Sequence, residues 1–430
     1  MSNGAIGKIG FWGVVAIGVG GMVGGGIFAV LGLAVQLAHG GTPLAFALAG
    51  VVALLTTYSY AKLSVAYPSR GGTVTFLDRV FGSGMLTGSL NVLLWLSYVV
   101  MLSLYAFAFG SYGATFLPQE WQGIGTHALI SLSVITIGGL NLLSADLIGR
   151  AESWIVGLKV AILLFFVGAG VIGVNSAQLA PGTWSPPLQL AAGGMIIFLA
   201  YEGFELIANT AHDVRDVART LPRAYFTAVG FVIALYVLVS LVTVGNLTLD
   251  RIVAARDFAL AEAARPFLGQ AGFTLIAVAA MLSTASAINA TLYGAARLSY
   301  CIARDGELPA MLEQKVWGKP LEGLLITAGL TLFVANTFDL TSISTLGSAG
   351  FLLIFAAVNT ANARHAPHTN SHAWVSAIGA VACLTALAAL IWQTTRTTPA
   401  NLWILAALVA LAVIIEGGYR LTKREIRLHD

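Results

Sequence analysis

Long apolar runs recur along the whole chain and are separated by short polar segments. A helix that crosses a bilayer needs roughly 20 mostly apolar residues. By that measure the hydrophobic pattern predicts twelve spans. They are residues 10–38, 43–66, 85–115, 126–143, 152–174, 190–212, 223–246, 268–299, 320–337, 342–361, 373–392 and 401–419.

The pattern favours helices over a membrane barrel. Backbone groups in lipid must be hydrogen-bonded within the segment or within a closed barrel. Barrel strands alternate polar and apolar residues over about ten positions, whereas runs such as Val160 to Val171 do not alternate. The composition agrees, because 57% of the residues are hydrophobic and 10% are charged, against about 25% charged in soluble domains. The expected class is an all-α integral membrane protein.

Basic residues predict the orientation, because they are enriched in cytoplasmic loops. With the N-terminus in the cytoplasm, the outer side holds only Arg251, Arg256, Arg265 and Arg396. Both termini are then cytoplasmic, which predicts a multi-pass protein of the cytoplasmic (inner) membrane. The basic residues on the cytoplasmic side are Lys8, Arg70, Arg79, Arg150, Arg215, Arg219, Arg223, Arg304, Lys315, Lys319, Arg364, Arg420, Lys423, Arg424 and Arg427.

The composition argues against several classes of function. The net charge of +3 is small and its basic residues are scattered, so we expect no nucleic-acid partner. Cys301 and Cys383 suggest neither a disulfide framework nor a metal site. A histidine group on a polar loop lacks a cysteine and is interpreted as a solvated linker. We therefore expect no metal, no cofactor and no enzyme. The histidines are His365, His368 and His372.

A glycine-rich stretch interrupts the first span, where residues 20–26 hold five glycines in seven positions. Glycine destabilises a helix interior by roughly 1 kcal/mol against alanine, so the middle of this span should unwind. The freed amides would attract a carboxylate, and the freed carbonyls would attract an ammonium group or sodium. The alternative is close helix packing through small residues, but these glycines cover all faces of the helix.

Two acidic residues, Glu202 and Glu205, lie in the middle of the sixth span. A carboxylate at the bilayer centre costs at least about 2.5 kcal/mol unless it is paired or hydrated. Glu202 either faces a cavity and binds a cation or a proton, or has a structural role; the residues leave both open. Glu205 lies deeper in the cytoplasmic half, and the structural interpretation is favoured for it.

Lys159 stands about two turns into the fifth span. A lysine there must pair or lose its proton, so it is either an internal cation that takes up and releases a proton, or a residue that snorkels to the cytoplasmic face. Ser283 and Thr284, in the eighth span, carry hydroxyls that could coordinate a cation and are equally common as packing residues.

The interrupted spans are the first and the sixth, five spans apart. That placement points to an inverted-repeat transporter with a site at the midplane, as in the leucine-transporter-type fold. We expect a ten-helix core over residues 1–365, with repeats at about 8–175 and 188–362, and two accessory helices with a cytoplasmic tail over residues 366–430.

Four stretches resemble motifs of the amino acid–polyamine–organocation transporter superfamily. The resemblance covers about residues 8–360, and each motif alone is weak. The stretches are Gly21 to Phe28; Phe198 to Glu205 with Asp213–Asp216 and Leu221–Ala224; Leu292–Arg297 with Ala303–Pro309; and Lys159.

This resemblance implies a 5+5 inverted repeat with helices 1 and 6 broken and, usually, two further helices. It implies that a substrate carboxylate meets the amides of Gly24, Gly25 and Gly26, and that Tyr201 covers the ligand as part of a gate. Lys159 matches a lysine that takes the place of sodium in proton-coupled members, and Ser283 and Thr284 match the sodium-site region. The amino group would meet carbonyls near Ile17, Gly18, Gly20, Phe198 and Ala200.

The departure from the family pattern is Glu202, because many amino acid carriers have a neutral residue there. An acid beside Tyr201 would suit a cationic amino acid, a diamine or a small amine, or it could be the proton carrier. The expected function is a secondary transporter of amino acids or related organic amines, proton-coupled and working by alternating access. The alternative is a sodium-independent exchanger; a channel and a membrane sensor fit less well.

Overall fold

The computed structural model describes residues 9–143, 145–304 and 321–421, and these ranges are helical apart from two isolated β-bridges. The α-helices are α1 (Phe11–Met22), α2 (Gly26–Ala38), α3 (Thr42–Ala66), α4 (Thr73–Phe81), α5 (Met85–Ala114), α6 (Gln122–Leu143), α7 (Ala145–Gly170), α8 (Pro187–Ile196), α9 (Val217–Asn246), α10 (Leu249–Ala254), α11 (Ala259–Arg304), α12 (Leu321–Thr337), α13 (Leu340–Arg364), α14 (Ala373–Thr397) and α15 (Ala400–Leu421). The 3₁₀ helices are η1 (Gln119–Trp121), η2 (Val171–Gly173), η3 (Ser176–Leu179), η4 (Pro181–Thr183), η5 (Ile197–Tyr201), η6 (Phe204–Asp213) and η7 (Arg256–Phe258).

Some of the residues used in the predictions lie outside the described ranges. The motif residues Asp305 to Pro309 are among them, as are six basic residues used for the orientation. These six are Lys8, Lys315, Lys319, Lys423, Arg424 and Arg427.

The described residues contain ten helices that are long and apolar enough to cross a membrane. The count becomes eleven if α1 and α2, which meet at a bend of 47°, form one span. The predicted ninth span corresponds to a shorter apolar helix, Glu322–Thr337. An all-helical membrane protein is therefore confirmed, while the number of twelve spans stays a prediction.

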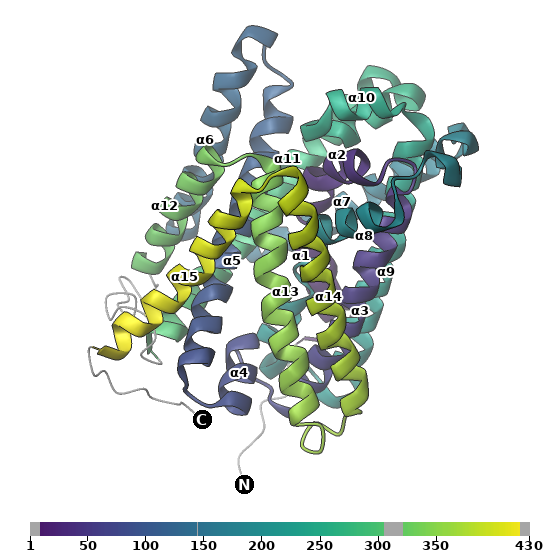
Figure 1. Ribbon diagram of the computed structural model, residues 1–430. Coiled ribbons are helices and arrows are strands. Elements are labelled where there is room, and N and C mark those ends of the chain that lie inside the picture. The colour runs from purple at the N-terminus through teal and green to yellow at the C-terminus, as the bar shows by residue number, and fades with distance from the viewer. Residues whose placement is uncertain (1–8, 144, 305–320, 422–430) are drawn as a thin grey trace.

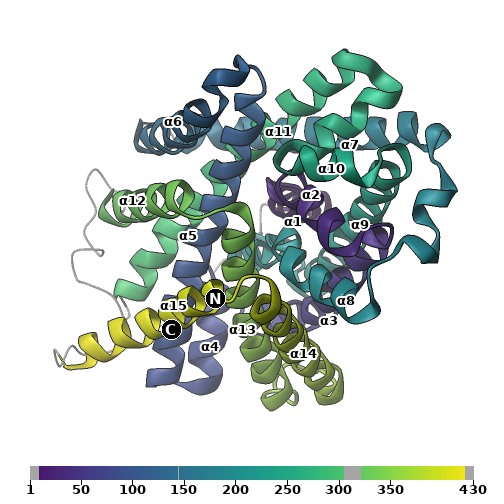
Figure 2. The same cartoon turned by 45° about the horizontal axis from the view of Figure 1, so that its top comes forward.

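The helices divide into central and peripheral ones. The most apolar window of α5 is 89% buried inside the protein, and so is that of the segment Pro187–Asp213. The corresponding window is only 22% buried in α15. Figure 2 shows α6, α12 and α15 arranged around α5, and α1, α2 and α8 grouped on its other side. The central position of α5 and of the sixth predicted span puts their polar side chains inside the protein.

The bundle has two ends, which we call the α4 face and the α10 face after the short helices that lie there (Figure 1). The turn between α13 and α14 shares the α4 face, where Lys62 Nζ donates to Asn370 O at 2.6 Å. At the α10 face, the predicted loop of residues 247–268 is largely helical, since it forms α10, η7 and the start of α11. Gly269, with φ of 63°, separates this start from the rest of α11.

The first and sixth predicted spans run antiparallel and are joined at both ends. Ile9, before α1, forms a bridge with Val214, after η6. His39, after α2, forms a second bridge with Trp184, before α8. Because each bridge joins the start of one segment to the end of the other, the two segments lie side by side through the bundle.

Candidate functional site

The interruption of the first predicted span lies between α1 and α2, and we call the glycine-rich stretch Gly20–Gly26 that contains it break one. Its glycines permit close contacts with neighbouring helices. A β-carbon on Gly25 would lie 2.4 Å from Tyr105 Cδ1 and 2.9 Å from Thr284 Cγ2. A β-carbon on Gly24 would lie 2.9 Å from Ala287 Cβ. Larger residues therefore cannot occupy break one without displacing α5 or α11.

Gly18, Gly20 and Gly26 also pack closely, each against a different neighbour. A β-carbon on Gly18 would meet Ile207 at 2.6 Å, one on Gly20 would meet Val156 at 2.7 Å, and one on Gly26 would meet Ala200 Cα at 2.8 Å. From the sequence, interruption of the helix and close packing against neighbouring helices are alternative explanations of these glycines. In the structure the same run of glycines does both, because the contacts fall on several faces of the helix.

Side chains from three helices hold the carbonyls that break one leaves without helical partners. Lys159 Nζ, from α7, donates to Gly20 O at 2.9 Å. Tyr236 from α9 donates its hydroxyl to Met22 O at 2.7 Å, and Ser283 from α11 donates to Val23 O at 3.1 Å and to Gly24 O. Irregular backbone at membrane depth is tolerated only where protein or water satisfies it, and here protein does.

The amides of break one have fewer partners than its carbonyls. Among the described residues, neither Gly24 nor Gly25 donates its N–H to a backbone oxygen. The first amides of a helix also lack partners within it, and α2 begins at Gly26. This leaves a cluster of backbone donors at the start of α2, where the helix dipole favours negative charge.

Lys159 and Ser283 thus donate to neighbouring carbonyls of break one, while their predicted roles stay predictions. Lys159 is 2% exposed and lies against Gly20 instead of extending to the surface. Thr284 differs, because its hydroxyl donates to Ala280 O and Met281 O within its own helix, and its methyl group faces Gly25.

The interruption of the sixth predicted span, which we call break six, lies between η5 and η6. Gly203 there has φ of 117°, which only glycine adopts readily. A β-carbon on Gly203 would lie 2.3 Å from the carbonyl carbon of Gly21, and one on Gly21 would lie 2.7 Å from Gly203 O. The two breaks are thus in direct backbone contact.

The residues before break six are fully buried. Tyr201 donates its hydroxyl to Phe46 O at 2.8 Å, and its ring lies 5.3 Å from that of Tyr236. Ser348, from α13, accepts from Leu199 N at 3.0 Å and donates to Ile196 O at 2.8 Å. Phe198 and Ala200 are 0% and 1% exposed, whereas Ile17 on α1 is half-buried.

The two glutamates of break six differ in their partners. Glu205 accepts Gly203 N at 2.7 Å on one oxygen and the Tyr98 hydroxyl at 3.2 Å on the other. Glu202 is 0% exposed, and neither of its oxygens accepts a hydrogen bond from a described residue. Unlike Glu205, Glu202 therefore receives no hydrogen bond from the described part of the protein.

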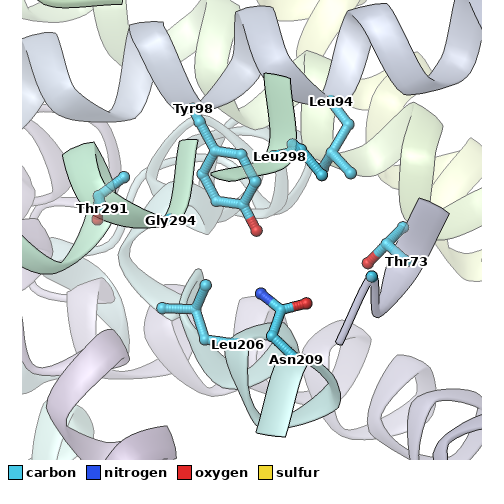
Figure 3. A pocket seen from close by; sticks show the side chains of 9 residues that line it. Thr73, Leu94, Tyr98, Leu206, Asn209, Thr291, Gly294 and Leu298 are labelled. Atoms are coloured by element: carbon cyan, nitrogen blue, oxygen red, sulfur yellow. The ribbon is translucent and has the colours of Figure 1, made fainter. Parts of the chain in front are cut away.

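A pocket lies on the α4 side of break six and is shown in Figure 3. Tyr98 points its hydroxyl into it, opposite Asn209 and beside Thr73. The residues that line it come from α4 and the turn before it, and from α5, η6 and α11. They are Gly71, Thr73, Leu94, Tyr98, Leu206, Asn209, Thr291, Gly294 and Leu298.

Sequence reasoning missed Tyr98, Tyr236 and Ser348. Each is a hydroxyl-bearing residue inside an apolar span, and that was the only signal. Because many buried tyrosines and serines in these spans share this property, it does not single out the three that contact the breaks.

Comparison with known proteins gives one family and several relatives. The sequence profile of a family described as amino acid permease matches residues 9–414. An uncharacterized protein of Methanocaldococcus jannaschii is 38% identical over 355 residues, which are 81% of this chain and 80% of that protein. An inner membrane transport protein of Escherichia coli is 33% identical over 410 residues, 94% of this chain and 95% of that one.

Among solved structures, a mutant manganese transporter of Eremococcus coleocola superposes with a TM-score of 0.60. The match covers 96% of this chain and 95% of that chain at 13% identity. Structural similarity at such low sequence identity shows a common fold, the leucine-transporter-like one, and does not indicate a common substrate.

Proposed function

Because the chain belongs to the amino acid permease family, we propose that it moves an amino acid or a related organic amine across the cytoplasmic membrane by alternating access. The observation that carries the proposal is the contact between the two breaks. It places backbone donors at the start of α2 beside backbone and carboxylate acceptors of break six, and an amino acid needs both.

In this proposal the chain has twelve spans, with α1 and α2 forming one interrupted span and α12 forming the ninth. The first ten spans make an inverted repeat, and α14 and α15 are accessory. The α4 face is cytoplasmic, as the distribution of basic residues favours. The pocket beside Tyr98 then lies on the cytoplasmic side of the site.

The substrate carboxylate would bind the amides of Gly24, Gly25 and Gly26, and its amino group would bind carbonyls of Ile17, Gly18, Phe198 and Ala200. Because Gly21 and Gly203 touch, binding requires the two breaks to separate. Gly20 O already accepts from Lys159, so it becomes available to a substrate ammonium only when the lysine leaves it.

This competition suggests how protons are coupled to transport. Protonated Lys159 holds Gly20 O and Ser283 holds the neighbouring carbonyls, so fewer oxygens remain for a sodium ion. Loss of the proton from Lys159 weakens its bond to Gly20 O and frees that carbonyl. Lys159 would therefore act as the coupling cation in place of sodium.

Uptake into proteoliposomes tests this role of Lys159. Lys159→Ala should abolish the stimulation of uptake by an inward proton gradient, while exchange between internal and external substrate persists. Lys62→Ala is the matched control, since Lys62 lies at the end of α3 and binds Asn370 O; it should keep the stimulation. Unchanged proton-driven uptake by Lys159→Ala would refute the coupling role.

A further inference from the structure

The carboxyl groups of Glu202 and Glu205 form a second protonation site that the function proposed above does not use. Both side chains are buried, at 0% and 1% exposure. They flank Gly203, whose amide donates to Glu205, and each carboxyl group interacts with the other. A carboxylate is only an acceptor, so the two groups can share a hydrogen bond only when one of them is protonated.

The surroundings of the pair do not compensate two negative charges. None of the salt bridges between described residues involves either glutamate. The cation nearest the contact between the breaks is Lys159, which donates to Gly20 O beside Gly21 and is a single positive charge. The other titratable groups that interact with the pair are buried tyrosines of α3, α5 and α9 and one thiol of α14, all of which are uncharged at neutral pH. They are Tyr60, Tyr98, Tyr105, Tyr225 and Cys383.

The hydrogen bonds assign the proton to one partner. Glu205 accepts from Gly203 N and from the Tyr98 hydroxyl, which suits an ionised carboxylate. Glu202 accepts from no described residue, which suits a neutral acid that donates to Glu205. Like-charged carboxyls at close range share one proton for the same reason.

We propose that Glu202 and Glu205 bind one proton between them and exchange it with the α4-face pocket through Tyr98. Tyr98 connects the two, because its hydroxyl donates to Glu205 and also lines the pocket (Figure 3). The proton leaves Glu202 for Glu205, and Glu205 passes it to water in the pocket by way of the Tyr98 hydroxyl. The pair is then left with two negative charges.

The pair is placed to influence the contact between the breaks. Gly203 lies between the two glutamates in sequence, donates its amide to Glu205 and touches Gly21. Two negative charges in a poorly hydrated site repel each other strongly, so loss of the proton destabilises the buried arrangement of Glu202 and Glu205 that holds Gly203 against Gly21.

Infrared difference spectra of the purified full-length protein in lipid nanodiscs test the proposal without any substrate. At neutral pH the wild type should show the C=O band of a protonated, buried carboxyl, and Glu202→Gln should lack it. Glu416→Gln is the matched control, because Glu416 is a third buried glutamate, paired with Arg420 on α15; it should keep the band.

Tyr98→Phe tests the exchange route. It should keep the band, but the shift of the band after transfer to D₂O should slow by roughly ten- to a hundredfold, since a hydrogen bond to a charged group contributes about 1.5–3 kcal/mol. Tyr112→Phe, on the same helix but bonded to Phe28 O, should exchange at the wild-type rate.

Three results would overturn the proposal: a wild type without the band, a band that persists in Glu202→Gln, or a band that sodium removes at constant pH, which would indicate a cation site. If Glu202→Gln does not fold, Glu205→Gln serves instead. It should shift the band, because the acceptor changes from carboxylate to amide, and an unshifted band counts against the pair. These readouts involve no transport, so their failure leaves the role of Lys159 untouched.

Discussion

Break one and break six touch each other, yet they are built from different chemistry. Break one offers mainly backbone atoms, because five of its seven residues are glycines, and side chains of α7, α9 and α11 hold its carbonyls. Break six has two carboxyl groups in or beside it, those of Glu202 and Glu205, and receives fewer partners from outside. Under the function proposed above, backbone atoms would recognise what all amino acids share, so discrimination between substrates would fall to break six and its neighbours.

Disruption of the contact between the breaks should cause the largest loss of stability and transport. Gly203→Ala adds a β-carbon 2.3 Å from Gly21 C at a residue with φ of 117°. Strain and overpacking together should cost about 2–5 kcal/mol of stability, and transport should fall to background. Thermal unfolding and uptake measure the two effects.

Gly230→Ala is the control for that substitution, because a β-carbon at Gly230 in α9 would meet nothing within 4 Å. It should keep uptake and gain up to about 1 kcal/mol from its better helix propensity. Equal behaviour of the two variants would show that the breaks do not depend on their mutual contact.

A smaller loss of stability is expected when a residue that hydrogen-bonds to one of the breaks is replaced. Ser348→Ala removes two hydrogen bonds from the backbone before break six and leaves Leu199 N unsatisfied, which should cost about 1–3 kcal/mol. Tyr236→Phe removes one bond, to Met22 O in break one, and should cost about 1 kcal/mol. Thermal unfolding of both variants checks the order; the reverse order would mean that break one depends more on its outside partners.

The smallest effect is expected from His365, which lies outside the spans. Its titration also changes the stability with pH, so it must be accounted for when the pH dependence of the two breaks is compared. Partial burial, with His368 and Arg364 nearby, lowers the pKa of His365 from 6.5. The folded state then binds the proton less readily than the unfolded state. This contribution to stability is present above pH 6.5 and is lost as pH falls through the lowered pKa.

The magnitude should be a few tenths of a kcal/mol, because His365 is only partly buried and solvent screens its interactions. Unfolding temperatures of the wild type and His365→Gln, measured from about pH 8 to about pH 5, should show a slightly steeper decline for the wild type. Parallel curves would assign all pH dependence to other groups.

The spans and break one could be predicted from the sequence because composition determines them. An apolar run of sufficient length has few alternatives in a membrane, and five glycines in seven positions have few alternatives in a helix. The 3₁₀ winding of η6 was not predictable, because it depends on what the backbone packs against. The partner of Glu205 was not predictable either, since nothing local separates Tyr98 from the other buried tyrosines.

The two bridges at the ends of these segments have a mechanical consequence. Ile9 exchanges two hydrogen bonds with the residues around Val214, at 3.0 and 2.9 Å, so α1 cannot swing outward at the α4 face unless η6 swings with it or these bonds rupture. The bridge at His39 and Trp184 links α2 and α8 in the same way at the other end. Gly21 and Gly203 are in backbone contact between the two bridges, so we expect the two segments to move together at each end.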